Sequence, residues 1–241
     1  MLDCIEFKIR NYLDKYLYSV IFISTDKINQ KITIYPDGCD YMIFSSTKYH
    51  GLIKKSVNPQ ELSVDNEDLI LLRLKPYTLH FLENHNEKYF ESLNTILDAV
   101  FETKSVMKII AVLNHYLFEN LDHKFEKHLS VEKEIVDYIN FHQGNILIQD
   151  IEANFSVNVR TVQRRFNKSM SISPKEYVDI IRFQSEIVKL NFLKLKKHNE
   201  YPEWFKDYSH YYKFFKKFSN KTPKKFFQTK ETHFNSVYDI Y

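Results

Sequence analysis

Glycine and cysteine are scarce in this sequence, and long apolar runs are absent. Three glycines in 241 residues mean that most turns need Asn or Ser, and Asn tolerates left-handed backbone better than most residues do. The two cysteines, Cys4 and Cys39, match no metal-ligand spacing and no disulfide framework, so we expect reduced thiols and a cytoplasmic protein. No apolar run approaches the ~20 residues of a membrane helix, and the charged residues 1–15 do not resemble a secretory signal.

Aromatic and charged residues, by contrast, are plentiful. The chain has 20 Phe and 17 Tyr, and its 44% hydrophobic and 27% charged residues are globular values that fit one large or two modest domains. The charge is uneven: residues 1–129 have 15 Lys and Arg against 18 Asp and Glu, whereas residues 130–241 have 19 against 13. A basic C-terminal half joined to a mildly acidic half suggests a polyanion-binding module attached to a different function.

Motifs for catalysis, metal binding and cofactor binding are missing. The sequence has no P-loop, no dinucleotide-binding glycine pattern and no nucleophile elbow. His80 and His85 are five residues apart, as are His123 and His128, but neither pair has a third ligand at a recognisable offset. The sequence therefore predicts a protein that is not an enzyme and that uses no metal or cofactor.

One stretch, Asn158–Tyr177, combines a basic amphipathic helix with a turn and the start of a second helix. Val162, Phe166 and Met170 recur every four residues and therefore share one helix face. Arg, Gln and Asn dominate the opposite face, and their hydrogen-bonding groups match base edges in the major groove of DNA. That polar face consists of Arg160, Thr161, Gln163, Arg164, Asn167 and Lys168.

A short first helix at Gln149–Phe155 and a tight connection at Ser156–Val157 precede this stretch. Two helices joined in this way are typical of a helix-turn-helix. An ordinary amphipathic helix with a solvated basic face is the alternative, because a basic patch alone is only a footprint of nucleic-acid binding.

The same pattern occurs a second time, 49 residues later. Phe166 corresponds to Phe215, and Pro174 corresponds to Pro223. The other matched pairs are Arg164 and Lys213, Lys168 and Lys217, Ser171 and Asn220, Ser173 and Thr222, Lys175 and Lys224, and Tyr177 and Phe226. Internal repetition at a fixed offset indicates a duplicated structural unit.

The two copies, RTVQRRFNKSMSISPKEY and DYSHYYKFFKKFSNKTPKKF, resemble the paired helix-turn-helix domain of the AraC/XylS family of bacterial transcription regulators. The second motif of that family runs roughly S-H-F-x-R-x-F-K-x-x-x-G-x-T-P. This chain matches it with Ser209, His210, Tyr211, Lys213, Phe215, Lys216, Asn220, Thr222 and Pro223. The resemblance covers about Ser130–Gln228.

The resemblance implies which side chains contact DNA. The expected base readers are Arg160, Gln163 and Arg164, with Thr161 and Asn167 on the same face, and in the second copy Ser209, His210, Tyr212 and Lys213. Lysines toward the helix ends better suit phosphates, which fix the register of a protein on DNA without reading its sequence. These are Lys168, Lys216 and Lys217.

Local signals predict the helices around these motifs. Ser130 is expected to begin a helix that runs through Phe141, with Ile135, Tyr138, Ile139 and Phe141 facing inward. Ser173–Glu176 is a capping box that launches a connector helix to about Asn191. At 1.5 Å per residue this connector spans roughly 27 Å, which suits two recognition helices in successive major-groove segments.

Both copies depart from the family pattern in their first helix, the second copy more than the first. Glu152 and Glu200 stand where a small Ala is usual, Trp204 replaces a Gly, and Pro202 removes a backbone donor. We therefore expect the first copy to contribute more to sequence specificity than the second.

The sequence pattern of the N-terminal half predicts strands followed by helices. Residues rich in Ile, Tyr, Val and Phe indicate strands at Tyr18–Ile23, Lys31–Tyr35, Tyr41–Ser45 and Leu69–Leu74. Between Tyr77 and Leu121 the period is helical, with one apolar stripe at Phe90, Leu93, Ile96, Leu97, Val100 and Phe101. A second stripe follows at Val106, Ile109, Ile110, Val112, Leu113, Tyr116, Leu117 and Leu121. Such helices pack within the chain or form a dimer contact.

The expected fold class is therefore α+β, with a β-rich and helical sensing or dimerisation domain in residues 1–128 and an all-α DNA-binding domain in residues 129–241. The protein is expected to be a sequence-specific regulator of transcription that binds double-stranded DNA. Its expected location is the cytoplasm, in association with the nucleoid. The candidate partners besides DNA are a small-molecule or protein effector, a second copy of the chain and RNA polymerase, with no membrane. The alternative is a helical scaffold whose basic face binds an acidic protein.

Overall fold

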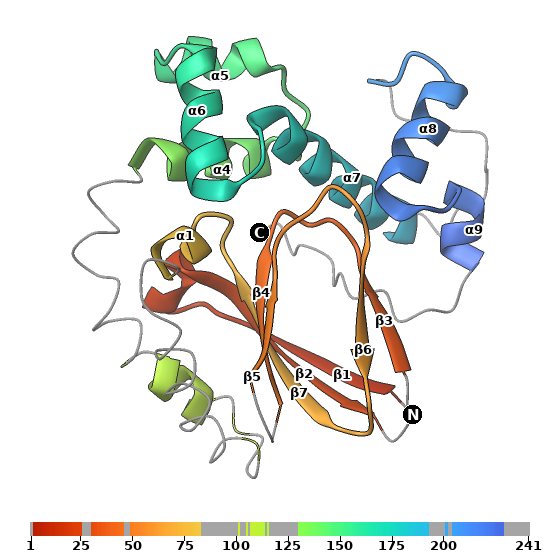
Figure 1. Cartoon of the computed structure of the whole chain (residues 1–241). Coiled ribbons are helices and arrows are strands. Elements are labelled where there is room, and N and C mark those ends of the chain that lie inside the picture. Colours follow the sequence, from red (N-terminus) through yellow and green to blue (C-terminus); the bar gives the residue numbers. More distant parts are fainter. Residues whose placement is uncertain are drawn as a thin grey trace. The chain divides into compact units, whose positions relative to one another are not determined.

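The structure, a computed structural model, describes residues 2–25, 30–45, 49–82, 101, 105, 107–113, 115, 130–192, 201 and 204–228 (Figure 1). The chain divides into two compact units. The first, which we call the sheet unit, consists of Met1–Lys31, Cys39–Lys55 and Ser63–Ser130. The second, which we call the helical unit, consists of Ile32–Gly38, Ser56–Leu62 and Val131–Tyr241. Two N-terminal segments therefore belong with the C-terminal helices.

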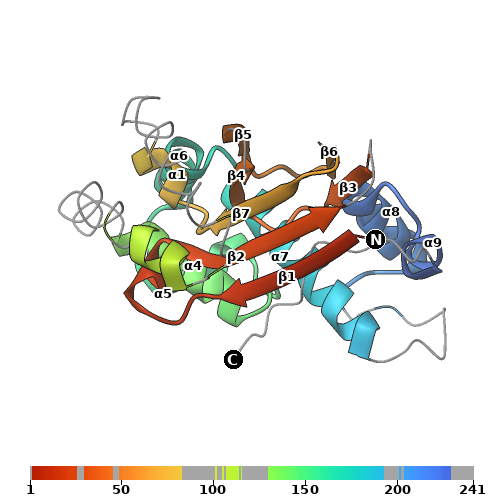
Figure 2. The ribbon, with the colours of Figure 1, turned by 90° about the horizontal axis from the view of Figure 1, so that it is seen from below.

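Five strands form the sheet of the sheet unit, in the order β1-β2-β7-β4-β5. All four neighbouring pairs in this order are antiparallel. Figure 2 shows β2 between β1 and β7. The strands are β1 (Leu2–Lys8), β2 (Leu17–Thr25), β4 (Asp40–Ser45), β5 (Tyr49–Ile53) and β7 (Asp68–Leu74). A separate two-stranded sheet pairs β3 (Gln30–Ile34) with β6 (Gln60–Val64).

The four predicted strands are confirmed as β2, β3, β4 and β7, with ends that differ by no more than two residues. Every residue of β4 is buried, and so are all but the first of β7, which explains their continuous apolar runs. The strands β1, β5 and β6 were not predicted. Their sequences LDCIEFK, YHGLI and QELSV mix apolar residues with acids, amides and a glycine, and these residues are depleted in strands.

A buried charge lies on β7, the central strand of the sheet. Arg73 of β7 is 4% exposed, and its Nη1 lies 3.5 Å from Glu6 Oε1 of β1. Its guanidinium also lies 5.5 Å from the centre of the Tyr18 ring. Ion pairing and the aromatic face together compensate for the loss of hydration that burial of the guanidinium causes.

Helices follow the sheet, as the period of the sequence predicted. A short helix α1 covers Thr78–Leu82, and residues 107–113 are also helical. Ile109 and Leu113, from the second predicted stripe, are buried at 0% and 1% exposure. The first stripe lies outside the described residues apart from Phe101, which is 8% exposed.

The described helices of the C-terminal region follow one another closely. They are α4 (Ser130–Phe141), α5 (Ile148–Phe155), α6 (Val159–Met170), α7 (Pro174–Phe192), α8 (Tyr208–Ser219) and α9 (Pro223–Gln228). The predicted helices at residues 130–141, 149–155 and 159–170, and the connector from residue 174, are confirmed. None of the helices in the described parts of the chain is long and apolar enough to span a membrane.

The prediction that Phe141 faces inward is wrong, because its side chain is 73% exposed. The buried face of α4 carries Ile135, Val136 and Ile139. Phe141 lies two residues beyond Ile139, which places it roughly 200° around the helix and on the opposite side.

The turn after α4 needs its glycine. Gly144 has a φ of +71°, and a Cβ at this position would lie 2.6 Å from both the backbone N of Arg182 and the carbonyl O of Val178. The Arg182 side chain donates from Nη2 to the Gly144 carbonyl at 2.8 Å. The turn therefore packs directly on the backbone of α7, and this contact fixes α4 against the connector.

Candidate nucleic-acid interface

The helices α6 and α8 are equivalent elements of the sequence repeat. Each has twelve residues, and both ends of α8 lie 49 residues after the ends of α6. The helices that follow them, α7 and α9, begin at Pro174 and Pro223, which are also 49 residues apart. The offset that relates the two sequences therefore also relates the helix boundaries.

Equivalent residues of the repeat cap the two helices at both ends. The Asn158 side chain accepts a hydrogen bond from the backbone N–H of Arg160 at 2.9 Å and thereby caps the N-terminus of α6. In the second copy Asp207 accepts from the backbone N–H of His210 at 2.7 Å. Each helix ends at a left-handed residue, Ser171 or Asn220, with φ of +57° and +56°. Asn and Ser thus replace glycine here.

The two helices also bury equivalent positions. The buried residues of α6 are Val162, Phe166, Ser169 and Met170, and those of α8 are Tyr211, Phe215, Phe218 and Ser219. An offset of 49 relates all four pairs. This confirms that Val162, Phe166 and Met170 form the inward face, and it leaves the same faces of both helices toward solvent.

An equivalent pair of rings anchors each helix to the one that follows it. The rings of Phe166 and Tyr177 lie edge to face with centroids 6.4 Å apart. Phe215 and Phe226 make the corresponding contact at 5.3 Å. Tyr177 and Phe226 are both fully buried, so each copy has an aromatic anchor at the same place.

The outward face of α6 is polar and basic. Arg160, Gln163, Arg164, Asn167 and Lys168 are exposed, and Thr161 is half-buried. Together with Asn158, all of these except Lys168 line one open concavity of about 490 Å³. Residues 160, 163, 164 and 167 follow helical spacing, so their side chains project from one side of α6.

The outward face of α8 is basic and aromatic. Ser209, His210, Lys213, Lys216 and Lys217 are exposed, and Tyr212 is half-buried. The His210 ring lies 5.2 Å from the ring of Phe205, so part of this side chain packs on the turn that precedes α8. The Lys217 ammonium lies 4.9 Å from the centre of the Phe218 ring.

Two exposed lysines that were not among the predicted DNA-binding residues lie near the starts of α7 and α9. Lys175 follows the first residue of α7, and Lys224 follows the first residue of α9; both are exposed. They are another pair with the offset of 49. The sequence signal for both lysines is their position directly after the Pro that begins the helix in each copy of the repeat.

Charges inside the first copy hold α6 and α7 in place. The capping box at the start of α7 is confirmed, because the Glu176 carboxylate accepts from both the backbone N–H and the hydroxyl of Ser173 at 2.7 Å. The hydrogen bond from the backbone N–H and, to a lesser extent, that from the hydroxyl hold the pKa of Glu176 below its ordinary value. Arg165, the remaining arginine of α6, pairs with Glu132 of α4 at 3.5 Å rather than joining the outward face.

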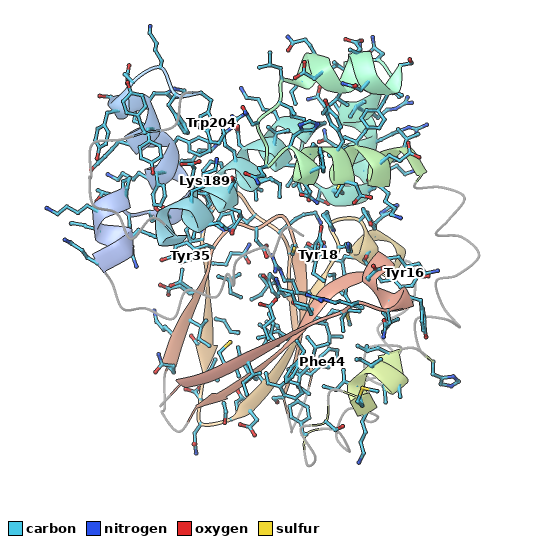
Figure 3. All side chains as sticks on the ribbon, turned by 180° about the vertical axis from the view of Figure 1, so that it is seen from behind. Tyr16, Tyr18, Tyr35, Phe44, Lys189 and Trp204 are labelled. Atoms are coloured by element: carbon cyan, nitrogen blue, oxygen red, sulfur yellow. The ribbon has the colours of Figure 1, made fainter. Side chains whose placement is uncertain are left out.

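The turn before α8 contains a half-buried tryptophan. The Lys189 ammonium lies 4.5 Å from the centre of the Trp204 ring, and the two side chains are labelled together in Figure 3. Among the described residues, the Trp204 indole N–H and the Tyr211 hydroxyl are buried without a hydrogen-bond partner. Residues 201 and 204–207 are not helical, whereas Glu200 and Pro202 lie outside the described residues.

No cluster of three or more His, Cys, Asp or Glu side chains that could hold a metal ion occurs among the described residues. Cys4 and Cys39 do not form a disulfide. The arrangement offers hydrogen-bond donors and positive charge on an exposed surface, and these groups suit the binding of a polyanion.

Known proteins resemble this chain only distantly. No model of a protein family matches it, and no curated protein matches it. Among solved structures, ToxT from Vibrio cholerae at 1.65 Å resolution is similar, with 13% identity, coverage of 94% of this chain and 97% of that chain, and a TM-score of 0.42. ToxT from strain SCE256 of the same organism, bound to an unsaturated fatty acid, has 14% identity, coverage of 94% of both chains and a TM-score of 0.40. We assign neither a family nor a ligand from similarities of this size.

Proposed function

We propose that this chain is a sequence-specific regulator of transcription of the AraC/XylS type, which binds double-stranded DNA through two helix-turn-helix motifs. The motifs are α5 with α6, and α8 with the segment that precedes it. The observation that carries the proposal is the repetition of caps, buried faces and aromatic anchors at an offset of 49 residues. This repetition gives two helices the same outward face, and both faces are basic.

The connector α7 has a length that suits this role. Its 19 residues span roughly 28 Å at 1.5 Å per residue. Successive major-groove segments on one face of DNA repeat every ~34 Å. A connector of this length lets one polypeptide hold both recognition helices against one face of the duplex.

The two motifs have unequal roles in this proposal. At the four equivalent outward positions α6 carries Arg160, Gln163, Arg164 and Asn167, whereas α8 carries Ser209, Tyr212, Lys213 and Lys216. Arg, Gln and Asn make bidentate contacts to guanine or adenine, and none of them occurs at these positions of α8. We therefore assign most of the sequence discrimination to α6, and mainly phosphate contacts and general affinity to α8, with His210, Lys168 and Lys217 at the edges of the two surfaces.

The sheet unit is assigned to sensing an effector or to dimerisation, and a regulator of this kind also contacts RNA polymerase. The DNA-binding part is residues 129–241 together with the N-terminal segments that complete the helical unit.

Selection of duplex DNA from a random pool with the full chain tests the proposal. The winning sequence is then titrated by fluorescence anisotropy at several salt concentrations, with a shuffled duplex as the control. We expect an enriched site and a steep salt dependence, because phosphate contacts release counterions. Weak binding without any enriched sequence, combined with capture of an acidic protein by the same basic surface, would instead favour the scaffold function.

A further inference from the structure

The Tyr35–Gly38 segment, which follows β3, contacts the aromatic anchors of both copies of the repeat. Six of the seven residues in Ile32–Gly38 are buried, although the segment lies far from the C-terminal helices in sequence. Figure 3 labels Tyr35 where β3 ends. This segment is part of the helical unit, so its contacts lie within that unit.

At one end of the segment, Gly38 lies against the anchor of the first copy. A Cβ on Gly38 would lie 2.6 Å from Cε2 of Tyr177, and Gly38 has a φ of +78°. Both the space and the backbone conformation therefore require glycine. Only three glycines occur in the chain, and this one allows the backbone to approach the Tyr177 ring closely.

At the other end, Tyr35 packs on the anchor of the second copy. Its ring lies edge to face with the ring of Phe226, with centroids 4.9 Å apart, and Tyr35 is 1% exposed. Between the two anchors, the buried Gln184 of α7 donates from Nε2 to the Pro36 carbonyl at 2.5 Å. The four residues thus reach Tyr177, the middle of the connector and Phe226 in turn.

We infer that the Tyr35–Gly38 segment is a staple that fixes the two helix-turn-helix motifs relative to each other and thereby sets the half-site spacing that the protein accepts. This inference rests on the proposed function. Tyr177 and Phe226 are equivalent residues of the repeat, so a segment that contacts both restrains the separation and rotation of the two copies. Because DNA turns once in about 10.5 base pairs, one added base pair rotates a half-site by roughly 34°.

The first experiment measures the restraint without DNA. Spin labels are placed at the equivalent exposed positions with Lys168→Cys and Lys217→Cys, in a full chain whose own thiols are removed with Cys4→Ser and Cys39→Ser. The distance between the labels is measured by double electron–electron resonance. We expect a narrow distribution that broadens with Tyr35→Ala and stays narrow with the matched control Tyr35→Phe, which keeps the ring.

The second experiment measures the consequence for DNA. Full-length variants are titrated with duplexes in which the two selected half-sites are moved together or apart by one or two base pairs. We expect the unmodified chain to lose about tenfold in affinity per base pair, since a rigid connector loses effective concentration when the span is wrong. Tyr35→Ala should reduce this loss to about twofold and leave affinity for the isolated α6 half-site unchanged.

Gln184→Leu keeps a side chain of similar volume on α7 but removes the hydrogen bond to Pro36. It replaces Tyr35→Ala in both experiments if Tyr35→Ala does not fold. An unchanged distance distribution and an unchanged spacing profile in a folded variant overturn the inference alone. Selection that yields no enriched sequence overturns the proposed function, whereas the distance measurement still decides whether the segment restrains the two copies.

Discussion

Side chains on the outward face of α6 differ in the information they can read from DNA. Arg164 and Gln163 are both exposed and have planar hydrogen-bonding groups. The Arg164 guanidinium matches two acceptors of guanine, and the Gln163 amide matches a donor and an acceptor of adenine. Lys216 on α8 is equally exposed, but its ammonium is a compact charge without a preferred partner geometry. Substitutions at these positions should therefore affect specificity and affinity differently.

Arg164→Ala should remove discrimination at one or two base pairs of the selected site. We expect a loss of about 1–3 kcal/mol for the specific duplex, which is the size of one good bidentate contact, and little loss for a shuffled duplex. Anisotropy titrations of every single-base variant of the site check this. Equal losses on the selected and shuffled duplexes would contradict a base-reading role, and Glu134→Ala on the exposed side of α4 is the control.

Lys216→Ala should weaken binding to all duplexes alike. Loss of one phosphate contact lowers the slope of log K against log salt by about one, because fewer counterions are released. The slope is measured over salt concentrations of about 50 to 300 mM. We prefer Lys216 to Lys217, since the charge of Lys217 also interacts with the carboxylates of Glu176 and Asp179. A change that is confined to one sequence would reassign Lys216 to base reading.

Glu186 should make stability fall with rising pH. Burial raises the pKa of Glu186 to about 7 from an ordinary 4.5, although Lys189 and Arg182 oppose the shift. An acid with a raised pKa in the folded state contributes stability that is fully present below pH 4.5 and is lost as pH rises through about 7. The free energy of unfolding of Glu186→Gln, relative to that of the unmodified chain, should therefore be higher at pH 8 than at pH 5.

Urea unfolding at both pH values measures this difference for Glu186. The control is Glu134→Gln, which changes an exposed carboxylate on α4. A difference between Glu186→Gln and the unmodified chain that is the same at both pH values would show that the Glu186 carboxylate does not titrate in this range.

At the scale of elements, α7 is both the connector and part of the second core. Phe183 of α7 lies 5.2 Å from the ring of Phe215, 5.3 Å from that of Phe218 and 6.5 Å from that of Phe226. It is fully buried. The second copy of the repeat is therefore held on α7 mainly by one aromatic cluster.

Phe183→Ala should lower the free energy of unfolding by about 3–5 kcal/mol, because it removes the ring and leaves a cavity among three others. The matched variant Phe183→Leu keeps most of the volume and should lose much less. Denaturant unfolding measures both, and hydrogen exchange of α8 and α9 amides locates the effect. A small loss in both variants would mean that the neighbouring side chains collapse into the space left by the ring.

At the scale of the whole molecule, the helical unit is discontinuous in sequence. It takes Ile32–Gly38 and Ser56–Leu62 from the N-terminal half and the rest from residue 131 onward. The first of these segments contributes Tyr35 to the ring of Phe226 and a backbone acceptor to Gln184. A fragment that starts at residue 130 lacks both contacts and exposes the surfaces they cover.

The fragment 130–241 should therefore be less stable than the same helices in the full chain. We expect a lower midpoint of thermal unfolding and faster amide exchange in α7 and α9, because buried Gln184 loses its acceptor and Phe226 becomes exposed. Calorimetry and hydrogen exchange on both chains measure this. Equal protection of α7 and α9 in the two chains would mean that residues 32–38 only lie on the helices without stabilising them.

Sequence alone determined the elements whose signals are local. The spacing of Val162, Phe166 and Met170 predicted the buried face of α6, and Ser173 with Glu176 predicted the start of α7; both are confirmed. Capping and helical periodicity act within a few residues, so they can be read directly along the chain. The offset of 49 residues is equally visible in the sequence, and it predicts two equivalent helices.

Only the tertiary structure decided which distant segments meet. The sequence at Tyr35–Gly38 predicts a strand end and a turn, but nothing local indicates that it contacts Tyr177, Gln184 and Phe226. Burial depends on which surfaces come together from far apart in the chain, and a pattern along one segment does not contain that information.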